Sequence, residues 1–296
     1  MDPAQMIQFG LSGITHGSVY AIVAIGFNII YNTTGIINFA QGEFVILGAM
    51  IAITLAGVLP LPAAIALAVA ATMLLGGLLE LVFIRPVRHA PVLRLIVITI
   101  GLSILMREGM LHVWDEKVRA LPVFTGTDTS TVTIAGAHIS TQALWVLGAC
   151  GVIVAALTLF FRRTTTGRAM RACADDRMAA RLCGIPERWM VTLSFVLSAG
   201  IGALAGCVIS PITQTQYDMG SSLAIKGFTV AVLGGLGNSM AAVAAGLLLG
   251  LLEVFTISQL PVAYEEAVSI VVLLLVLVCR PTGLFARPAA GAARAA

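Results

Sequence analysis

The sequence has very few charged residues, and this shortage limits the class of protein. Asp, Glu, Lys and Arg together make up 10% of the 296 residues, whereas 59% are hydrophobic. Soluble domains carry about a quarter charged residues. A chain this poor in charge cannot cover its own surface with polar groups, so it needs lipid or other apolar helices around it. The composition therefore excludes an ordinary soluble domain.

Lysine is nearly absent, which excludes one way of using ATP. The only lysines are Lys117 and Lys226, and neither follows a glycine. A Walker A loop needs a Gly-Lys pair to hold the nucleotide phosphates, so this chain cannot bind and hydrolyse ATP by that route. If the protein depends on ATP, a separate subunit has to hydrolyse it.

Catalytic and metal-binding patterns are missing as well. The sequence has no HExxH pair, no nucleophile elbow and no Cys/His cluster. Its five cysteines lack ligand spacing and are predicted to be small buried hydrophobic residues. The net charge of +3 is modest, and the basic residues lie in loops, so a nucleic-acid partner is not indicated. We expect no enzyme activity, no cofactor and no metal site.

Long apolar segments dominate the chain instead. A helix needs about 20 apolar residues to cross a bilayer, and the candidate segments are 7–30, 36–58, 61–84, 95–114, 143–161, 190–210, 223–240, 241–258 and 266–279. Glycine pairs at four-residue spacing, such as Gly13/Gly17 and Gly246/Gly250, allow membrane helices to pack closely. We predict an all-α, polytopic membrane protein with about eight or nine spans. Residues 7–58 and 223–258 could each contain a broken or re-entrant helix.

Arginine placement predicts the orientation, because basic loops are retained on the cytoplasmic side. Three arginines flank the loop 85–94, seven lie within 162–189, and three follow the last span. The loop 115–141 holds one Lys and one Arg and is predicted to be external. Within it, Thr, Val and Ile alternate between residues 126 and 136, which is typical of a hairpin. We expect one transmembrane domain over 1–287, an external N-terminus, a cytoplasmic C-terminus and a disordered tail at 288–296.

The longest polar stretch of the second half is 162–189. Residues 167–182 are predicted to form one helix, with Arg171 and Asp175 spaced for a weak i,i+4 ion pair. Gly184 and Pro186 form a stop signal. Small and charged residues alternate around this helix, so it fits a protein cleft better than a lipid surface. From the residues alone, a loop that only fixes topology is the plainer interpretation.

Polar side chains inside apolar spans are functional candidates, because a charge at membrane depth costs about 2.5–3.5 kcal/mol. Asn38, Gln41 and Glu43 lie together, and Asn38 and Gln41 are predicted to share a helical face. They either border a translocation path or hydrogen-bond between helices. For Glu43 we favour the functional interpretation. Lys226 is either on the path or, as we favour, snorkels to the outer interface. Glu253 is expected to hydrogen-bond within the bundle.

Five stretches carry a family resemblance. They are GSVYAIVAIGFNIIYNTTGIINFAQGEFVILGA (17–49), ITIGLSILMRE (98–108), GRAMRACADDRMAARLCGI (167–185), a segment from SFVLSAGIGALAGCVISPI to LAIKGFTVAVLGGLGNSMAAVAAGLLLGLLE (194–253), and RPTGLF (280–285). In this order they resemble the high-affinity branched-chain amino-acid permeases of ATP-binding-cassette importers, and they span nearly the whole chain.

The resemblance implies a permease subunit of the bacterial inner membrane. It implies a path for leucine, isoleucine and valine, which an external or periplasmic binding protein delivers. The implied partners are a second related permease, two ATPase subunits, the binding protein and membrane lipid. Relatives that look similar carry urea, short amides or other small solutes, so these remain alternatives, as does a stand-alone channel or secondary transporter.

In that family the cytoplasmic loop docks on the ATPase. Carried onto this sequence, the coupling residues are Gly167, Arg168, Arg171, Asp175, Asp176, Ala179, Ala180, Gly184 and Ile185. The path candidates are Asn38, Gln41, Glu43 and Lys226.

Overall fold

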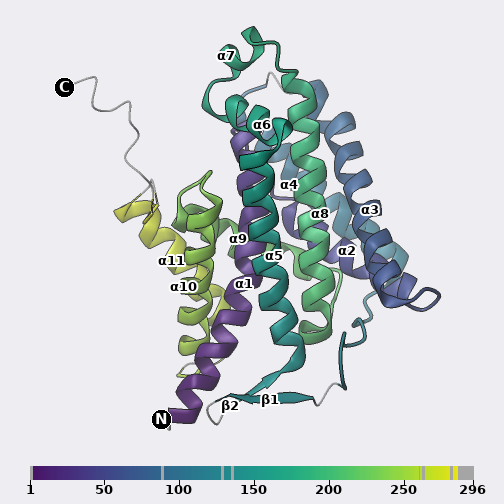
Figure 1. Ribbon diagram of the computed structural model, residues 1–296, viewed down its shortest axis with the longest axis vertical. Helices are drawn as coiled ribbons and strands as arrows, with labels where there is room; N and C mark the ends of the chain where they lie inside the picture. Colours follow the sequence, from purple (N-terminus) through teal and green to yellow (C-terminus); the bar gives the residue numbers. More distant parts are fainter. Residues whose placement is uncertain are drawn as a thin grey trace.

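The computed structural model describes residues 3–87, 90–127, 130–134, 137–259, 261, 264–280 and 283–285. This part of the chain is mostly helical (Figure 1). The helices are α1 (Pro3–Thr34), α2 (Gln41–Ala56), α3 (Leu61–Leu79), α4 (Val92–Trp114), α5 (Thr141–Arg163), α6 (Thr165–Asp175), α7 (Arg177–Leu182), α8 (Glu187–Thr213), α9 (Met219–Gly234), α10 (Ser239–Ile257) and α11 (Glu265–Cys279). The predicted disordered tail at 288–296 lies outside the described residues.

Each predicted apolar segment overlaps one of these helices, although 36–58 begins before α2 and 223–240 runs past the end of α9. In lipid the backbone has to satisfy its own hydrogen bonds, and a helix does so within one segment. Helices α1, α3, α5, α8 and α10 are long and apolar enough to cross a membrane, while α2, α9 and α11 are shorter apolar helices. The all-α membrane fold is confirmed. After α3 the chain continues as a π-helical turn, Glu80–Ile84, and a short 3-10 turn, Arg85–Val87.

Helices α1 and α10 cross at glycines, as the four-residue spacing predicts. A Cβ atom on Gly17 would lie 2.6 Å from the carbonyl oxygen of Gly246, and one on Gly13 would lie 2.9 Å from the Cα of Leu251. Real Cβ atoms do not approach backbone so closely, so only glycine fits at this crossing. The contact fixes α10 against the longest helix of the chain.

The two halves of the chain each contain a short helix that begins inside the bundle. Helices α2 and α9 have 16 residues each, or about 24 Å of helix, which is less than the roughly 30 Å hydrocarbon core. Their first turns touch, because Gly42 on α2 packs directly on the backbone of Gly220 on α9. These are the broken segments that the sequence allowed for.

Side-chain amides of α1 support the turn that follows α9. Gly35, with φ +65°, ends α1, and Gly237, with φ +94°, lies in the turn between α9 and α10. The Nδ2 atom of Asn32 donates to the Gly237 carbonyl at 3.0 Å, and the Gly237 N–H donates to Oδ1 of Asn28 at 3.0 Å. Non-helical backbone within a membrane protein needs such internal partners.

The two ends of the bundle carry different structures (Figure 1). Strands β1 (Thr131–Ile134) and β2 (Ala137–Ser140) form an antiparallel hairpin at the same end as the N-terminus, as predicted for the 115–141 loop. Gln8 of α1 exchanges two hydrogen bonds with the backbone of His138, which ties the hairpin to α1. Helices α6 and α7 lie at the opposite end.

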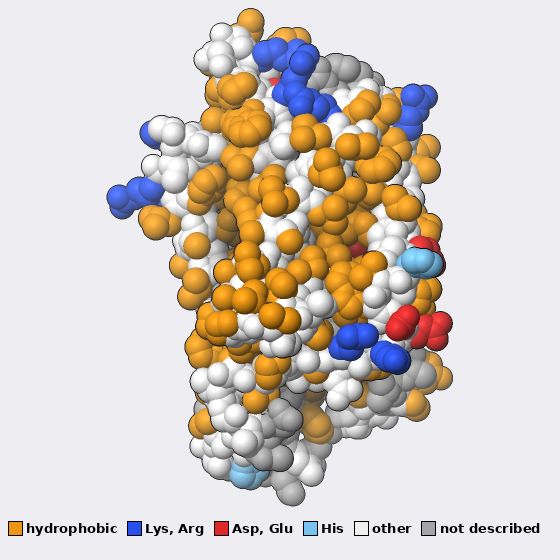
Figure 2. Space-filling model, turned by 90° about the vertical axis from the view of Figure 1, so that its right-hand side faces the viewer, with side chains coloured by type: hydrophobic (Ala, Val, Ile, Leu, Met, Phe, Trp, Pro, Cys, Tyr) orange, Lys and Arg blue, Asp and Glu red, His pale blue; other side chains and the backbone are white. Residues whose placement is uncertain are grey.

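The surface is largely apolar. Figure 2 shows hydrophobic side chains over most of one face, with Lys and Arg side chains in its upper part and again, beside Asp and Glu side chains, low on the right. Leu74, Leu93 and Val97 are each more than half exposed, as expected of residues that face lipid. The cysteine prediction is partly wrong: Cys183 and Cys279 are exposed, although the other three cysteines are buried.

Candidate functional site

The segment 162–189 folds as two short helices. The Thr164 hydroxyl accepts from the Gly167 N–H at 2.9 Å and caps α6. Asp176 Oδ1 accepts from the N–H groups of Met178 and Ala179 at 2.8 and 3.0 Å and caps α7. The predicted single helix over 167–182 is therefore wrong. Asp176 adopts an extended conformation, with φ −154°, because its side chain is a strong N-cap.

The ion pairs of this segment also differ from the prediction. The guanidinium of Arg171 donates to the carbonyl of Phe161 on α5 and forms no ion pair with Asp175. It therefore anchors α6 to the end of a membrane helix. Arg181 instead pairs with Glu187 across the turn into α8. That hydrogen bond to Glu187 raises the pKa of the Arg181 guanidinium, which stays protonated.

The end of α7 follows the predicted stop signal. Gly184 has φ +81°, the left-handed conformation that favours glycine. The N–H of Ile185 donates back to the carbonyl of Ala180 at 3.0 Å and closes the turn. The chain then reverses and enters α8.

Helix α6 is seated on the bundle, whereas α7 projects beyond it (Figure 1). Met170 and Cys173 of α6 are buried, and Gly167 lies against the backbone of Phe160, where a Cβ would not fit. Burial raises the pKa of the Cys173 thiol and keeps it protonated. On α7, by contrast, the side chains of Met178 and Leu182 are 68% and 84% exposed. These two residues, one helical turn apart, form an apolar tip outside the bundle.

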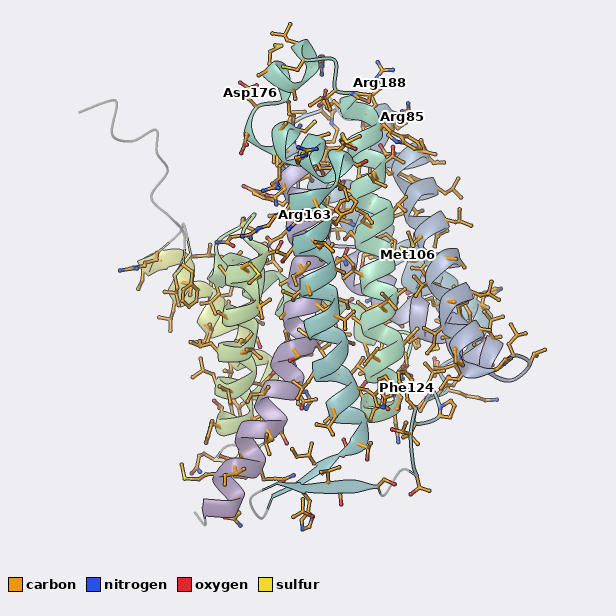
Figure 3. The ribbon with its side chains drawn as sticks, viewed as in Figure 1. Arg85, Met106, Phe124, Arg163, Asp176 and Arg188 are labelled. Atoms are coloured by element: carbon orange, nitrogen blue, oxygen red, sulfur yellow. The ribbon has the colours of Figure 1, made fainter. Side chains whose placement is uncertain are left out.

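Some of the predicted coupling residues are buried against the bundle, and the others are exposed. Gly167 and Ala180 are buried and Ile185 is half-buried, whereas the exposed ones are Arg168, Arg171, Asp175, Asp176, Ala179 and Gly184. Beside them lies a cavity of about 230 Å³, whose charged lining is Arg85, Arg177, Arg181, Arg188, Glu80 and Glu187. Figure 3 places Arg85, Arg188 and Asp176 together at this end. Glu80 of this lining is buried and accepts a hydrogen bond from Thr192 at 2.7 Å.

The polar patch at 38–43 lies at the start of α2. Asn38, Gln41 and Glu43 are all fully buried. Asn38 precedes the helix, and its Oδ1 accepts from the Ala40 N–H at 3.2 Å. The prediction that Asn38 and Gln41 share a helical face is wrong, because α2 begins only at Gln41.

Gln41 joins three helices through Ser198 of α8. Its Nε2 donates to the Ser198 carbonyl at 3.2 Å. The Ser198 hydroxyl lies 2.6 Å from Gln41 Oε1 and 2.9 Å from the Gly26 carbonyl of α1. Sequence reasoning missed Ser198, whose only signal is a hydroxyl within an apolar span.

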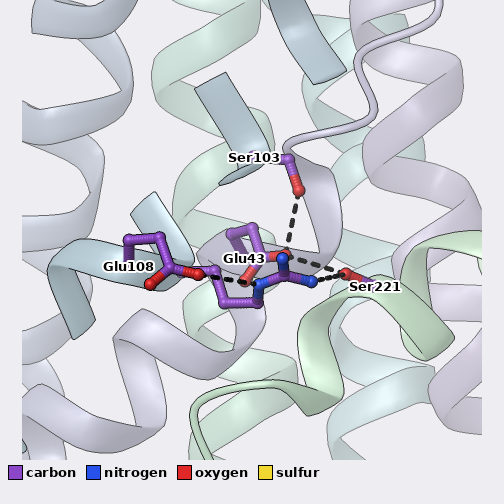
Figure 4. A network of polar contacts seen from close by, with 5 residues as sticks. Glu43, Ser103, Glu108 and Ser221 are labelled. Atoms are coloured by element: carbon purple, nitrogen blue, oxygen red, sulfur yellow. Dashed lines mark hydrogen bonds and ion pairs between the residues drawn. The ribbon is translucent and has the colours of Figure 1, made fainter. Parts of the chain in front are cut away.

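Glu43 belongs to a second polar cluster (Figure 4). Ser103 of α4 donates to Glu43 Oε1 at 2.9 Å, and Ser221 of α9 lies 3.5 Å from the same atom. Arg107 reaches Ser221 at 3.5 Å and Glu108 at 3.7 Å. The other carboxylate oxygen of Glu43 is buried without a hydrogen-bond partner among the described residues. The first turn of α2 favours this carboxylate through the helix dipole.

Lys226 forms a buried ion pair within the bundle. Its Nζ lies 2.7 Å from Oε1 of Glu253 on α10 and donates to the Tyr20 hydroxyl of α1 at 3.2 Å. The snorkelling prediction is wrong: Lys226 lies midway along α9 and is 6% exposed. The expectation that Glu253 bonds within the bundle is confirmed. Sequence reasoning missed Tyr20.

Taken together, the apolar helices, the broken segments and the buried polar clusters define a polytopic membrane protein of the transport class. Residues 10–277 match the family model for the branched-chain amino acid transport system / permease component. The chain belongs to that family.

Curated relatives match over nearly their whole length. The high-affinity branched-chain amino acid transport system permease protein BraD of Pseudomonas aeruginosa is 35% identical, over 94% of this chain and 95% of the relative. The corresponding protein LivH of Escherichia coli K12 is 33% identical, over 95% and 96%. A solved structure of PsaBC from Streptococcus pneumoniae in complex with Fab shares the fold, with a TM-score of 0.51 at 13% identity, and covers 94% of this chain and 96% of that chain.

Proposed function

We propose that this chain is the permease subunit of an ATP-binding-cassette importer in a bacterial inner membrane, and that it carries leucine, isoleucine and valine. Family membership supports the permease role. The names of BraD and LivH, which specify branched-chain amino acid transport, support the cargo. ATP is hydrolysed by two partner ATPases, since neither lysine of this chain follows a glycine. A second related permease and an external binding protein complete the importer.

The main structural support for this proposal is the projecting helix α7. An exposed apolar pair, Met178 and Leu182, at the arginine-rich end of the bundle is suited to a protein partner outside the membrane. In our proposal this end is cytoplasmic, α7 docks on the ATPase, and the C-terminus lies on the same side. The hairpin and the N-terminus then face the binding protein.

A charge placed on the tip of α7 tests the docking. Leu182→Asp puts an unpaired carboxylate into the interface, so we expect the ATPase subunits to co-purify less and ATP-driven uptake to fall. Val132→Asp, an exposed apolar position on the hairpin at the opposite end of the bundle, is the matched control for docking and should retain co-purification of the ATPase subunits. Unchanged co-purification and uptake in Leu182→Asp would contradict the proposal.

The path itself is part of the proposal. Buried polar groups at membrane depth support a role for Asn38, Gln41, Glu43 and Lys226 beside it. Thiol labelling of cysteines placed at these positions should differ between the ATP-bound and nucleotide-free importer. Solute flux through the chain alone in liposomes would instead favour a stand-alone channel or secondary transporter.

A further inference from the structure

A polar cavity lies beside the buried ion pair. It measures about 540 Å³ and is lined from α1, the end of α8, α9, α11 and the 214–218 connection. Tyr20 and Lys226, on its inner wall, lie midway along α1 and α9, so the cavity reaches the middle of the bundle. It lies on the hairpin side, since Thr213–Asp218 and Val118 border it.

One wall of the cavity carries opposite charges close together. Lys226, Ser222 and Glu266 line both this cavity and a small side cavity of about 20 Å³, which Ser269 also lines. The Ser269 hydroxyl is buried without a hydrogen-bond partner among the described residues. An ammonium, a carboxylate and two hydroxyls therefore converge on a space of a few ångströms. These groups can bind a small ligand that carries both charges.

The cavity also has an apolar lining. Ile209, Met219, Leu223 and Val118 line it beside the polar groups and offer no strong hydrogen bonds from their side chains. A pocket that combines a few polar groups with hydrophobic side chains can bind both ends of an amphipathic solute.

We infer that this cavity binds a zwitterionic α-amino acid with an aliphatic side chain. Its carboxylate lies at the Lys226 ammonium and the Tyr20 hydroxyl, and its ammonium lies at Glu266. Its side chain packs on Ile209 and Leu223. The inference rests on the proposed function and adds the place where this chain holds its cargo on the external side. The Lys226–Glu253 pair then has two roles: it keeps the lysine charged inside the bundle, and it presents that charge to the solute.

Labelling of Ser222→Cys in the assembled importer tests occupancy directly. The neutral reagent methyl methanethiosulfonate modifies the thiol, and peptide mass spectrometry measures the modification at position 222. Free L-leucine, without the binding protein, should protect by a factor of 1 + [L]/Kd, or about tenfold at ten times Kd. Leucinol, which lacks the carboxylate, and 4-methylpentanoate, which lacks the amine, should protect far less. No protection by leucine, or equal protection by leucinol, would overturn the inference.

A charge exchange separates binding from simple support of the bundle. Lys226→Glu combined with Glu253→Lys keeps an ion pair between α9 and α10 but moves the cation away from the cavity wall. We expect the importer to assemble while leucine uptake falls by about tenfold or more. Lys117→Gln, which removes the only other lysine of the chain, should leave uptake unchanged. If the exchange variant took up leucine at the wild-type rate, the ion pair would only hold the helices together.

The proposed cargo and the proposed binding cavity can be refuted separately. If the wild-type importer with its binding protein does not carry leucine, the proposed cargo is wrong. If the wild-type importer carries leucine but leucine never protects position 222, this cavity is not where the solute binds.

Discussion

The glycine crossing of α1 and α10 gives a stability prediction that can be worked from distances. In Gly17→Ala the new Cβ would lie 2.6 Å from the Gly246 carbonyl oxygen and 2.8 Å from the Leu247 Cα. Both atoms belong to the backbone, so the helices have to separate by several tenths of an ångström. Overpacking of this kind costs about 1–3 kcal/mol.

Gly10→Ala on the same helix is the matched control, because nothing lies within 4 Å of a Cβ at that position. The gain in helix propensity, about 1 kcal/mol, is common to both variants and cancels in their difference. At 2–4 °C per kcal/mol, Gly17→Ala should unfold roughly 2–12 °C below Gly10→Ala. The assay is thermal unfolding of the purified protein in detergent, followed by tryptophan fluorescence. Equal midpoints would refute the close approach of the two helices.

Three further predictions concern the polar sites. Asp176→Ala removes the N-cap of α7, which is worth about 1 kcal/mol, so the amide hydrogens of α7 should exchange faster. The control is Asp175→Ala, whose side chain caps neither helix, and equal exchange rates in the two variants would contradict the cap. Gln41→Ala and Ser198→Ala should be non-additive, with a coupling of about 0.5–3 kcal/mol in a double-mutant cycle, since the two side chains bond each other; simple additivity would mean that they act independently. Glu43→Gln should assemble better than Glu43→Ala, because only the amide keeps an acceptor for Ser103, and equal yields in detergent extracts would count against that bond.

The membrane helices were predictable because span length and hydropathy are local properties of the sequence. The hairpin at 131–140 was predictable for the same reason, from its alternating residues. The start of α2 was not, because Gln41 is fixed by Ser198, 157 positions away. Local spacing placed Asn38 on the helix, whereas Asn38 lies before α2 and its side chain accepts from the Ala40 N–H.

Lys226 shows the same limit at a charged residue. From the sequence it is a single lysine near the end of a span, and snorkelling is the ordinary outcome for such a residue. Its true environment depends on Tyr20, 206 positions away, and on Glu253 of the next helix. Asp176 is different, since an acidic residue followed by a helical pattern is a recognised N-cap signal and marks the break between α6 and α7.

Helix α1 connects the two ends of the molecule as a single rod. Its 32 residues measure about 48 Å. One end holds the hairpin through Gln8, and the other stops at Gly35, where a Cβ would lie 3.4 Å from the Arg177 guanidinium of α7. A rigid rod of this length turns a tilt of about 5° at one tip into a sideways shift of about 4 Å at the other. Because α10 packs on the backbone of α1 at the glycine crossing, such a tilt would move the hairpin and α10 together.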